Sequence, residues 1–366
     1  MLPESNPLLT DRTTIETDWE CGQKRWWYKE EGGTGIVPVE EAVWFRQGRD
    51  YHTDFADIAL AAEPELLAKE MIACLEGKIH ATEDAIAQEE LCRRAGWIAA
   101  NSLYLEPATR KDYQTLFVEH ELVLDRSPLW VAVTPDRVLE RVSDSKVVVR
   151  DYKGVGGWGI SKGWLESWPY AIQMQTLIAA VAEELDRPVG FAQVVGLSKG
   201  QEKFGRLNHP YVWANWSEKG GWIPQGEGGG KKDLTPRPVW EYPDGILAWV
   251  RKLGPEVASA QFGFSPPIYL NERLLGDLVT SRTRREREVK VFRKQASEDP
   301  KARVIHFEPR FSRCRPAIGA PCAYLVACHN ATVNADPIGS GLYVARSPHH
   351  DMERVEKGFE GGTNDD

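Results

Sequence analysis

The sequence predicts an α/β fold, and three observations support this. In residues 39–61, apolar side chains recur at steps of three and four residues, which is the spacing of a helix with one packed face. We expect a helical region over about 39–102. Short runs of β-branched and aromatic residues follow, separated by polar or proline-containing turns, as in successive strands. The expected strands cover 114–124, 128–140, 146–153 and, after a helix at about 168–185, 189–197.

The chain of 366 residues is longer than a typical domain, and we expect one globular unit with appendages. Glycine and proline are abundant in 217–238, which predicts a mobile surface insertion. The acidic, apolar-poor residues 351–366 predict a disordered tail. The expected divisions are an N-terminal segment (1–38), a helical region with the core (39–216), the insertion (217–238), C-terminal helices at 244–260 and 268–296 within 239–330, and an extension (331–366).

Charge and hydropathy narrow the functional classes. The formal net charge is -9, which argues against a generally basic nucleic-acid binder, so any such contact must come from a local patch. The first twenty residues lack the basic start and apolar run of a signal peptide, and no apolar stretch has the length of a membrane span. We therefore expect a cytoplasmic protein. In that compartment the six cysteines are not expected to form disulfides, so clusters among them indicate metal or redox chemistry.

Acidic side chains and a lysine lie in the expected strands. Asp151 and Lys153 are two residues apart and project from the same face of a strand. Asp136 lies on the preceding strand, whose short connection favours antiparallel pairing. Glu119 and Glu121 share a face one strand earlier. An isolated D-x-K is more often a solvated surface pair, but carboxylates gathered this closely repel one another unless a cation intervenes, which indicates a divalent metal site.

Pro135-Asp136 and Asp151-Tyr152-Lys153 resemble the signature of the PD-(D/E)XK nuclease superfamily. The resemblance implies a restriction-endonuclease-like core, a mixed β-sheet flanked by helices, which agrees with the element order above. Two further matches are similar to the RecB-type and AddB-type branch, including the CRISPR-associated iron–sulfur exonucleases. Gly48 and His52 have the G-x-x-x-H spacing that supplies an imidazole ligand. Gln173 fits the glutamine that helps position the lysine and a water, with Gln175 as the alternative.

The resemblance also implies residue roles. Lys153 would be the catalytic lysine, assisted by Gln173. Glu121 is the alternative to Glu119, because the acidic position of the family is loosely spaced. Histidine with carboxylates favours Mn²⁺ somewhat, while Mg²⁺ is the cellular default. The implied metal ligands are His52, Asp136, Asp151 and Glu119.

The cysteines divide into a group of four and a pair. Cys314, Cys322 and Cys328 cluster near the C-terminus, and Cys21 lies far upstream. Four thiolates suffice for a tetrahedral zinc or a [4Fe–4S] cube. The arrangement resembles the iron–sulfur staple of the same nuclease branch, although seven residues separate Cys314 from Cys322 where two are commonest, which keeps Zn²⁺ open. His329 is an alternative ligand. Cys74 and Cys92 stand singly in apolar helical patterns and are expected in the core.

A basic stripe offers a local nucleic-acid contact. Residues 281–315 contain twelve Lys or Arg and five Asp or Glu. Such a stripe can bind phosphates, or it can be a solvated helix face. Tryptophans beside the 154–163 loop offer stacking surfaces for bases, although most tryptophans are expected in the core. The candidate DNA-binding residues are Arg284, Arg285, Arg287, Trp158 and Trp164.

Together these features predict a metal-dependent DNA nuclease. We expect an exonuclease acting on single-stranded DNA or duplex ends, with a structural [4Fe–4S] cluster and a possible helicase or recombination partner. One alternative is a non-catalytic DNA-binding or recombination scaffold with the same fold. Another is a zinc-stabilised, structure-specific endonuclease. Fold alone does not establish activity, so the site decides among them.

Overall fold

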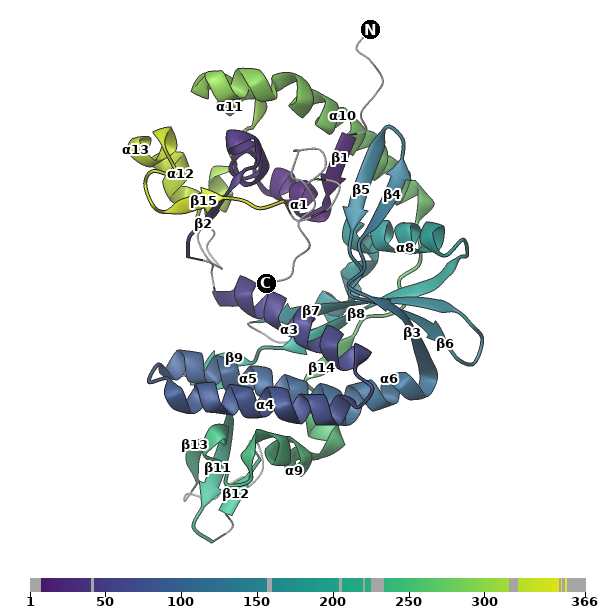
Figure 1. The fold of residues 1–366 in the computed structure, drawn as a ribbon, viewed down its shortest axis with the longest axis vertical. Helices are drawn as coiled ribbons and strands as arrows, with labels where there is room; N and C mark the ends of the chain where they lie inside the picture. Colours follow the sequence, from purple (N-terminus) through teal and green to yellow (C-terminus); the bar gives the residue numbers. More distant parts are fainter. Residues whose placement is uncertain are drawn as a thin grey trace.

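The centre of the fold is a five-stranded mixed sheet in the order β14-β8-β7-β6-β3 (Figure 1). The computed structural model describes residues 8–40, 43–156, 160–203, 206–219, 221–224, 234–315, 322–348, 350 and 353. β7 and β8 pair in parallel and the other neighbours are antiparallel. A run of valines makes β7 apolar on both faces, as the buried central strands of such sheets require. The strands are β3 (Tyr113–Val118), β6 (Arg137–Arg141), β7 (Val147–Val155), β8 (Val189–Ser198) and β14 (Phe262–Phe264).

Two of the expected strands divide where the chain bends. The first forms β3 and β4 (Leu122–Arg126), and the second forms β5 (Leu129–Val133) and β6. β4 and β5 leave the central sheet and form a second sheet with β1 (Leu8–Asp11). The expectation that 114–124 and 128–140 each form one strand is therefore wrong, whereas the expected strand at 146–153 is confirmed as β7. The bends fall at Glu119, which has a φ of 46°, and near Pro135, which has no N–H to donate to a ladder.

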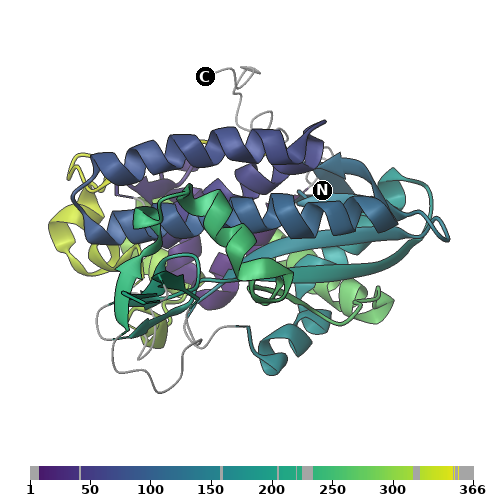
Figure 2. The same cartoon turned by 90° about the horizontal axis from the view of Figure 1, so that it is seen from below.

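Side chains alternate along β7, so its two faces meet different helices. Tyr152 packs in a core with the helices of the first helical region, whereas Val147 and Val149 pack in a core that includes α8. The predicted helical region is confirmed from Val43 onward, and α4 and α5 run side by side (Figures 1 and 2). The helices are α3 (Val43–Leu60), α4 (Pro64–Ala81), α5 (Ala85–Ala100), a π-helical turn (Asn101–Leu105), α6 (Glu106–Asp112), α7 (Lys162–Glu166), a 3₁₀ turn (Trp168–Tyr170) and α8 (Ile172–Glu184).

The predicted insertion contains regular structure. β11 (Trp213–Ser217), β12 (Gly221–Ile223) and β13 (Thr235–Pro238) form an antiparallel sheet, so the prediction of an irregular segment is wrong there. Trp216 lies opposite Trp222 across the β11–β12 pair, and such aromatic cross-strand pairs stabilise a sheet despite the flanking glycines. Residues 220 and 225–233 lie outside the described residues. A short hairpin, β9 (Gln201–Lys203) and β10 (Arg206–Asn208), precedes this sheet.

The later helices follow the predicted positions. Asn271 accepts a hydrogen bond from the N–H of Leu274 at 3.1 Å and begins the longest helix, as N-cap residues do. The elements are a 3₁₀ turn (Val239–Glu241), α9 (Gly245–Ser259), α10 (Glu272–Glu298), α11 (Pro300–His306), a 3₁₀ turn (Phe311–Arg313), α12 (Leu325–His329) and α13 (Ala331–Ala335). None of the helices in the described ranges is both long and apolar enough to cross a membrane.

The N-terminal and C-terminal segments pack together. β2 (Ile36–Pro38) pairs with β15 (Tyr343–Ala345), and a third core joins Trp26 and Trp27 to Phe307 and Tyr324. α1 (Arg12–Glu20), α2 (Gly22–Arg25), a π-helical turn (Trp26–Glu30) and a 3₁₀ turn (Glu31–Gly33) build the N-terminal part. The predicted disordered tail is wrong at Glu353, which is buried against Arg346 and Lys29. The rest of 351–366 lies outside the described residues.

Candidate metal centre

The two strand bends bring Glu119 and Asp136 together. The backbone N–H of Glu119 donates to the carbonyl of Asp136 at 3.3 Å. Asp136 lies in the bend directly before β6, whose first residue, Arg137, is opposite Arg150 of β7, so Asp136 lies beside the part of β7 that carries Asp151 and Tyr152. Asp136 is 8% exposed, and its Oδ2 accepts a hydrogen bond from the Tyr152 N–H at 2.5 Å. The two bends thus place the carboxylates of Glu119 and Asp136 at the edge of the central sheet.

α3 adds an imidazole to these carboxylates. The Nδ1 atom of His52 lies 3.3 Å from Oδ2 of Asp136 and 3.6 Å from Oε1 of Glu119. One potential ligand atom from each of the three residues lies within 4.8 Å of the other two. Tyr51 stacks on the His52 ring at 4.7 Å, and its hydroxyl accepts a hydrogen bond from the Gly154 N–H at 2.8 Å. These contacts fix α3 against the end of β7.

Asp151, Lys153 and Gln173 form the adjoining part of the site. The fully buried Asp151 carries its Oδ2 2.6 Å from Nζ of Lys153, and its Oδ1 accepts a hydrogen bond from Nε2 of Gln173 at 2.5 Å. Asp151 is not among the three residues with the closest ligand atoms. The Oε1 atom of Gln173 is buried and has no hydrogen-bond donor among the described residues. This leaves a polar atom available at the edge of the carboxylate cluster.

The two alternatives considered from sequence have other partners. Gln175 donates to the carbonyls of Pro169 and Tyr269 and accepts from the N–H of Asn271, so it joins α8 to the start of α10. Glu121 lies 3.1 Å from Nδ1 of His350. Gln173 and Glu119, and not Gln175 and Glu121, therefore lie at the candidate metal centre.

Burial and neighbouring charges shift the pKa values of His52 and of the three carboxyl groups beside it. Burial disfavours the His52 imidazolium, but the Asp136 charge and hydrogen bonds to Asp136 and Glu119 outweigh it and raise the pKa of His52 to about 9. Burial raises the pKa of Asp151, and the Asp136 charge adds to this effect despite Lys153. The pKa of Glu119 is raised, again mainly by burial. For Asp136, burial is opposed by the charges of His52 and Lys153, which hold its pKa below the usual range.

This donor set fits a divalent cation. One imidazole nitrogen and several carboxylate oxygens, partly dehydrated and mutually repelling, are the ligands that Mn²⁺ or Mg²⁺ takes in proteins. A divalent charge at this position would favour the ionised form of every carboxylate in the cluster.

Arg12 is a site neighbour that the sequence analysis missed. It is the first residue of α1, directly after β1, and β1 pairs in parallel with β5 just before the bend at Asp136. Burial lowers the pKa of Arg12, but Glu16, Asp151 and Asp136 raise it overall. Its Nε donates to Glu16 at 2.8 Å. Because the β1–β5 pairing spans more than one hundred residues, no local pattern indicates this placement.

The four cysteines of the proposed cluster lie in one region of the structure. The Sγ of Cys21 accepts a hydrogen bond from the Arg310 N–H at 3.3 Å, and that of Cys328 accepts from the Trp27 indole at 3.2 Å. Burial, together with the charges of the other three thiols, raises the pKa of Cys328 to about 11. No three of the four sulfurs lie within 4.8 Å of one another in the described chain.

The remaining pair of cysteines gives one confirmation and one correction. Cys92 is buried, and its thiol donates to the Tyr211 carbonyl at 3.0 Å, as expected of a core cysteine. Cys74 is exposed, so the prediction that it lies in the core is wrong. It lies on the outward side of α4, whose buried residues include Ile72, Leu75 and Ile79.

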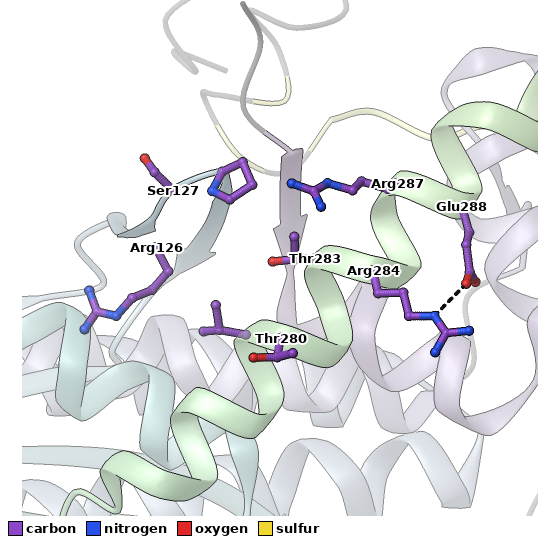
Figure 3. Close-up of a pocket in the computed structure, with 9 residues that line it drawn as sticks. Arg126, Ser127, Thr280, Thr283, Arg284, Arg287 and Glu288 are labelled. Carbon is purple, nitrogen blue, oxygen red and sulfur yellow. Dashed lines mark hydrogen bonds and ion pairs between the residues drawn. The ribbon is translucent and has the colours of Figure 1, made fainter. Parts of the chain in front are cut away.

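A groove lies between α10 and the turn that joins β4 to β5 (Figure 3). Its volume is about 530 Å³. Arg284 is mostly exposed and pairs with Glu288, while Arg287 is exposed beside it. The lining residues are Arg126, Ser127, Pro128, Val279, Thr280, Thr283, Arg284, Arg287 and Glu288. Hydroxyl groups on both walls and the Arg287 guanidinium suit an anion such as phosphate, whereas the Arg126 guanidinium is paired with Glu183.

The other candidate DNA contacts are placed differently. Arg285 donates to both carboxylate oxygens of Asp18 and to the carbonyl of His306, so its guanidinium is engaged within the protein. Trp164 is partly buried and packs edge-on against Trp168 at 5.4 Å. Trp158 lies outside the described residues.

Comparison with known proteins gives no match. Neither the models of known protein families nor the curated proteins match this chain.

Proposed function

We propose that this protein is a metal-dependent DNA nuclease with a restriction-endonuclease-like core, of the RecB and AddB type. The observation that carries the proposal is the convergence of His52, Glu119 and Asp136 beside Asp151 and Lys153. These are the residue types that metal-assisted phosphodiester hydrolysis requires, and they come from one helix and three strand ends. The central mixed sheet with helices on both faces supports the same proposal.

His52, Glu119, Asp136 and Asp151 would hold the metal ion. When bound, a Mg²⁺ or Mn²⁺ ion supplies Lewis-acid stabilisation of phosphate oxygens and an activated water. The protein prepares the position by desolvating Asp136 and Asp151, which strengthens their attraction for a cation. The Tyr152 N–H fixes the orientation of the Asp136 carboxylate.

Lys153 and Gln173 would act on the substrate side of the carboxylates. The Lys153 ammonium can stabilise negative charge that develops on the phosphate and orient the attacking water. Gln173 holds Oδ1 of Asp151, so Oδ2 faces the lysine, and Oε1 of Gln173 is available to accept a hydrogen bond from water. Arg12 adds a second positive charge near Asp136 and Asp151.

The substrate we propose is single-stranded DNA or a duplex end. The groove between α10 and the β4–β5 turn would hold a backbone phosphate through Arg287 (Figure 3), whereas Arg126 on its opposite wall is paired with Glu183. Pro128, which lines the groove, lies directly before β5. Asp136 lies beyond the other end of β5, eight residues after Pro128. A chain of this length reaches at most about 29 Å, so the groove and the proposed metal ion could contact one strand. Affinity should fall steeply with salt, since phosphate contacts release counterions.

Digestion of end-labelled DNA tests the proposal. Single-stranded and duplex substrates are incubated with Mg²⁺, Mn²⁺ or EDTA. The wild-type protein should shorten the labelled strand only with a divalent ion, and Lys153→Ala should slow cleavage about 100-fold because charge stabilisation is lost. Lys146→Ala, at the exposed opposite end of β7, is the matched control and should cleave normally. Equal amounts of product from wild type and Lys153→Ala would contradict the proposal that this protein is a nuclease.

We further propose that Cys21, Cys314, Cys322 and Cys328 bind a structural [4Fe–4S] cluster. A single tetrahedral zinc needs its sulfurs about 3.8 Å apart, given Zn–S bonds of about 2.3 Å, whereas a cube binds each thiolate through a different iron and spaces them more widely. The proposal of a cube follows the resemblance of the four cysteines to the iron–sulfur staple, and zinc is the alternative that metal analysis tests. The N–H donors to Cys21 and Cys328 would stabilise thiolates.

Anaerobic purification checks the cluster. The protein should be brown, with visible absorption and about four iron atoms per chain. Cys328→Ser should lose most of the iron and absorption, whereas Cys74→Ser, which changes an exposed thiol on α4, should keep both. A colourless wild-type protein with one zinc per chain would refute the iron–sulfur assignment.

A further inference from the structure

Two cations without ion-pair partners lie at the end of β7 and β8. Lys199 directly follows β8, and its N–H donates to the Val155 carbonyl at 2.8 Å, which extends the parallel pairing by one step. Arg93 of α5 lies behind it, with Nη1 donating to the Lys199 carbonyl at 3.4 Å. Within the described ranges, neither side chain forms an ion pair with a carboxylate.

The ammonium of Lys199 lies over Gly154, the residue after the proposed catalytic lysine. A methyl group added at Gly154 would lie 2.6 Å from Cε and 3.3 Å from Nζ of Lys199. The same methyl group would lie 3.3 Å from Cε1 of Tyr51. The absence of a side chain at Gly154 thus lets the end of the Lys199 side chain lie directly against the β7 backbone. Ligands of such sheets commonly bind at the carboxyl ends of parallel strands.

The charge of this pair is poorly compensated. Arg93 is 5% exposed, its guanidinium lies 5.4 Å from the centre of the Trp97 ring, and its Nε has no acceptor among the described residues. Burial and the charge of Arg93 lower the pKa of Lys199, and Glu90 opposes this only in part. Burial also lowers the pKa of Arg93, and the charges of Glu90 and Glu89 oppose this only in part. Dehydrated cations without a counter-ion in direct contact destabilise a folded protein. Their presence is explained if an anion binds there.

We propose that Lys199 binds a backbone phosphate of the nucleic-acid strand, with Arg93 as a positioning residue that adds to the positive field. This inference rests on the proposed nuclease function and names a substrate contact that the family signature does not include. Gly154 lies three residues after Asp151 on one strand, about 10 Å along it, and its Cβ position faces the side of Tyr152 and Tyr51, opposite to that of Asp151. Tyr51 joins the two places, because it stacks on His52 and accepts a hydrogen bond from Gly154. The bound phosphate would therefore neighbour the one that reacts.

Binding measured without divalent ions tests this contact independently of cleavage. A labelled single-stranded oligonucleotide is titrated in EDTA at several salt concentrations. Lys199→Met keeps the aliphatic stem and removes the charge; it should weaken binding about tenfold and make the salt dependence of log K shallower by about 0.7. Lys146→Met, at the other end of β7, is the control and should bind as wild type. Unchanged affinity and slope in Lys199→Met would overturn the proposal.

Thermal unfolding without ligand gives a second readout. Because the unpaired ammonium is dehydrated in the free protein, Lys199→Met should melt at a higher temperature than wild type while binding DNA more weakly. A lysine with a purely structural role would give a lower melting temperature, which contradicts the proposal. If inorganic phosphate alone stabilises wild type through Lys199 but the oligonucleotide does not bind, the anion is free phosphate and the strand contact is rejected. Oligonucleotide binding that depends on Lys199 without any metal-dependent cleavage would support this contact and reject the nuclease.

Discussion

Asp136→Asn should abolish divalent-ion-dependent DNA cleavage, lowering the rate at least about 1,000-fold. Asp136 is the carboxylate on which the candidate metal centre depends, because its Oδ2 lies beside His52 and accepts a hydrogen bond from the Tyr152 N–H. The amide has nearly the same shape, so the fold should persist. Calorimetric titration with Mn²⁺ should show binding to wild type and none to the variant.

Asp144→Asn is the matched control for this substitution. Asp144 lies in the exposed turn between β6 and β7 and pairs with Arg141. Cleavage and Mn²⁺ binding should both be retained. In addition, the pKa of His52, raised to about 9 largely through the Asp136 charge, should fall toward its ordinary value in Asp136→Asn, as seen in an NMR titration. Full cleavage activity of Asp136→Asn would contradict the proposed metal site.

Glu286→Gln should destabilise the protein by about 3 kcal/mol at pH 7, since it leaves buried guanidinium groups without their counter-ion. Glu286 of α10 accepts two hydrogen bonds from Arg25 and one from Arg282, and the Asp18 carboxylate joins the same network. Burial alone would raise the pKa of Glu286, but the two arginines outweigh it and lower the pKa to about 2. Urea unfolding of wild type and variant measures the difference.

The same substitution predicts a pH dependence with a definite sign. A carboxylate with a lowered folded-state pKa contributes its full stabilisation above the unfolded pKa of about 4.3 and loses it as pH falls toward the folded value. The difference between wild type and Glu286→Gln should therefore be largest above about pH 5 and shrink as pH falls toward about 2. Glu288→Gln, two residues along α10 and more exposed, should change stability by less than about 1 kcal/mol. A difference that stays constant from pH 7 to pH 3 would contradict the ion network.

Local periodicity was enough to predict much of the site. Two-residue alternation places Asp151 and Lys153 on one face, and a short connection places Asp136 on the next strand. The helical spacing around His52 predicts α3, and the structure brings His52 to Asp136. The metal, the cluster and the activity remain proposals.

Other features depend on contacts between distant segments. The bends at Glu119 and Pro135 arise because β4 and β5 pair with β1, and that pairing also brings Arg12 toward the carboxylates. A basic stripe does not reveal that Arg285 is bound by Asp18 while Arg287 faces the groove. The exposure of Cys74 depends on how α4 rotates against its neighbours. Sequence spacing carries none of this information.

The pairing of β2 with β15, and the core that Trp26 and Trp27 share with Phe307 and Tyr324, have a consequence for biosynthesis. The segment from Trp26 to Pro38, which follows α1 and α2, has its packing partners near the opposite end of the polypeptide. On the ribosome, a growing chain released only as far as β8 holds every proposed catalytic side chain but lacks the surface that secures α1 and α2. The N-terminal segment can therefore reach its packed position only after β15 has been synthesised.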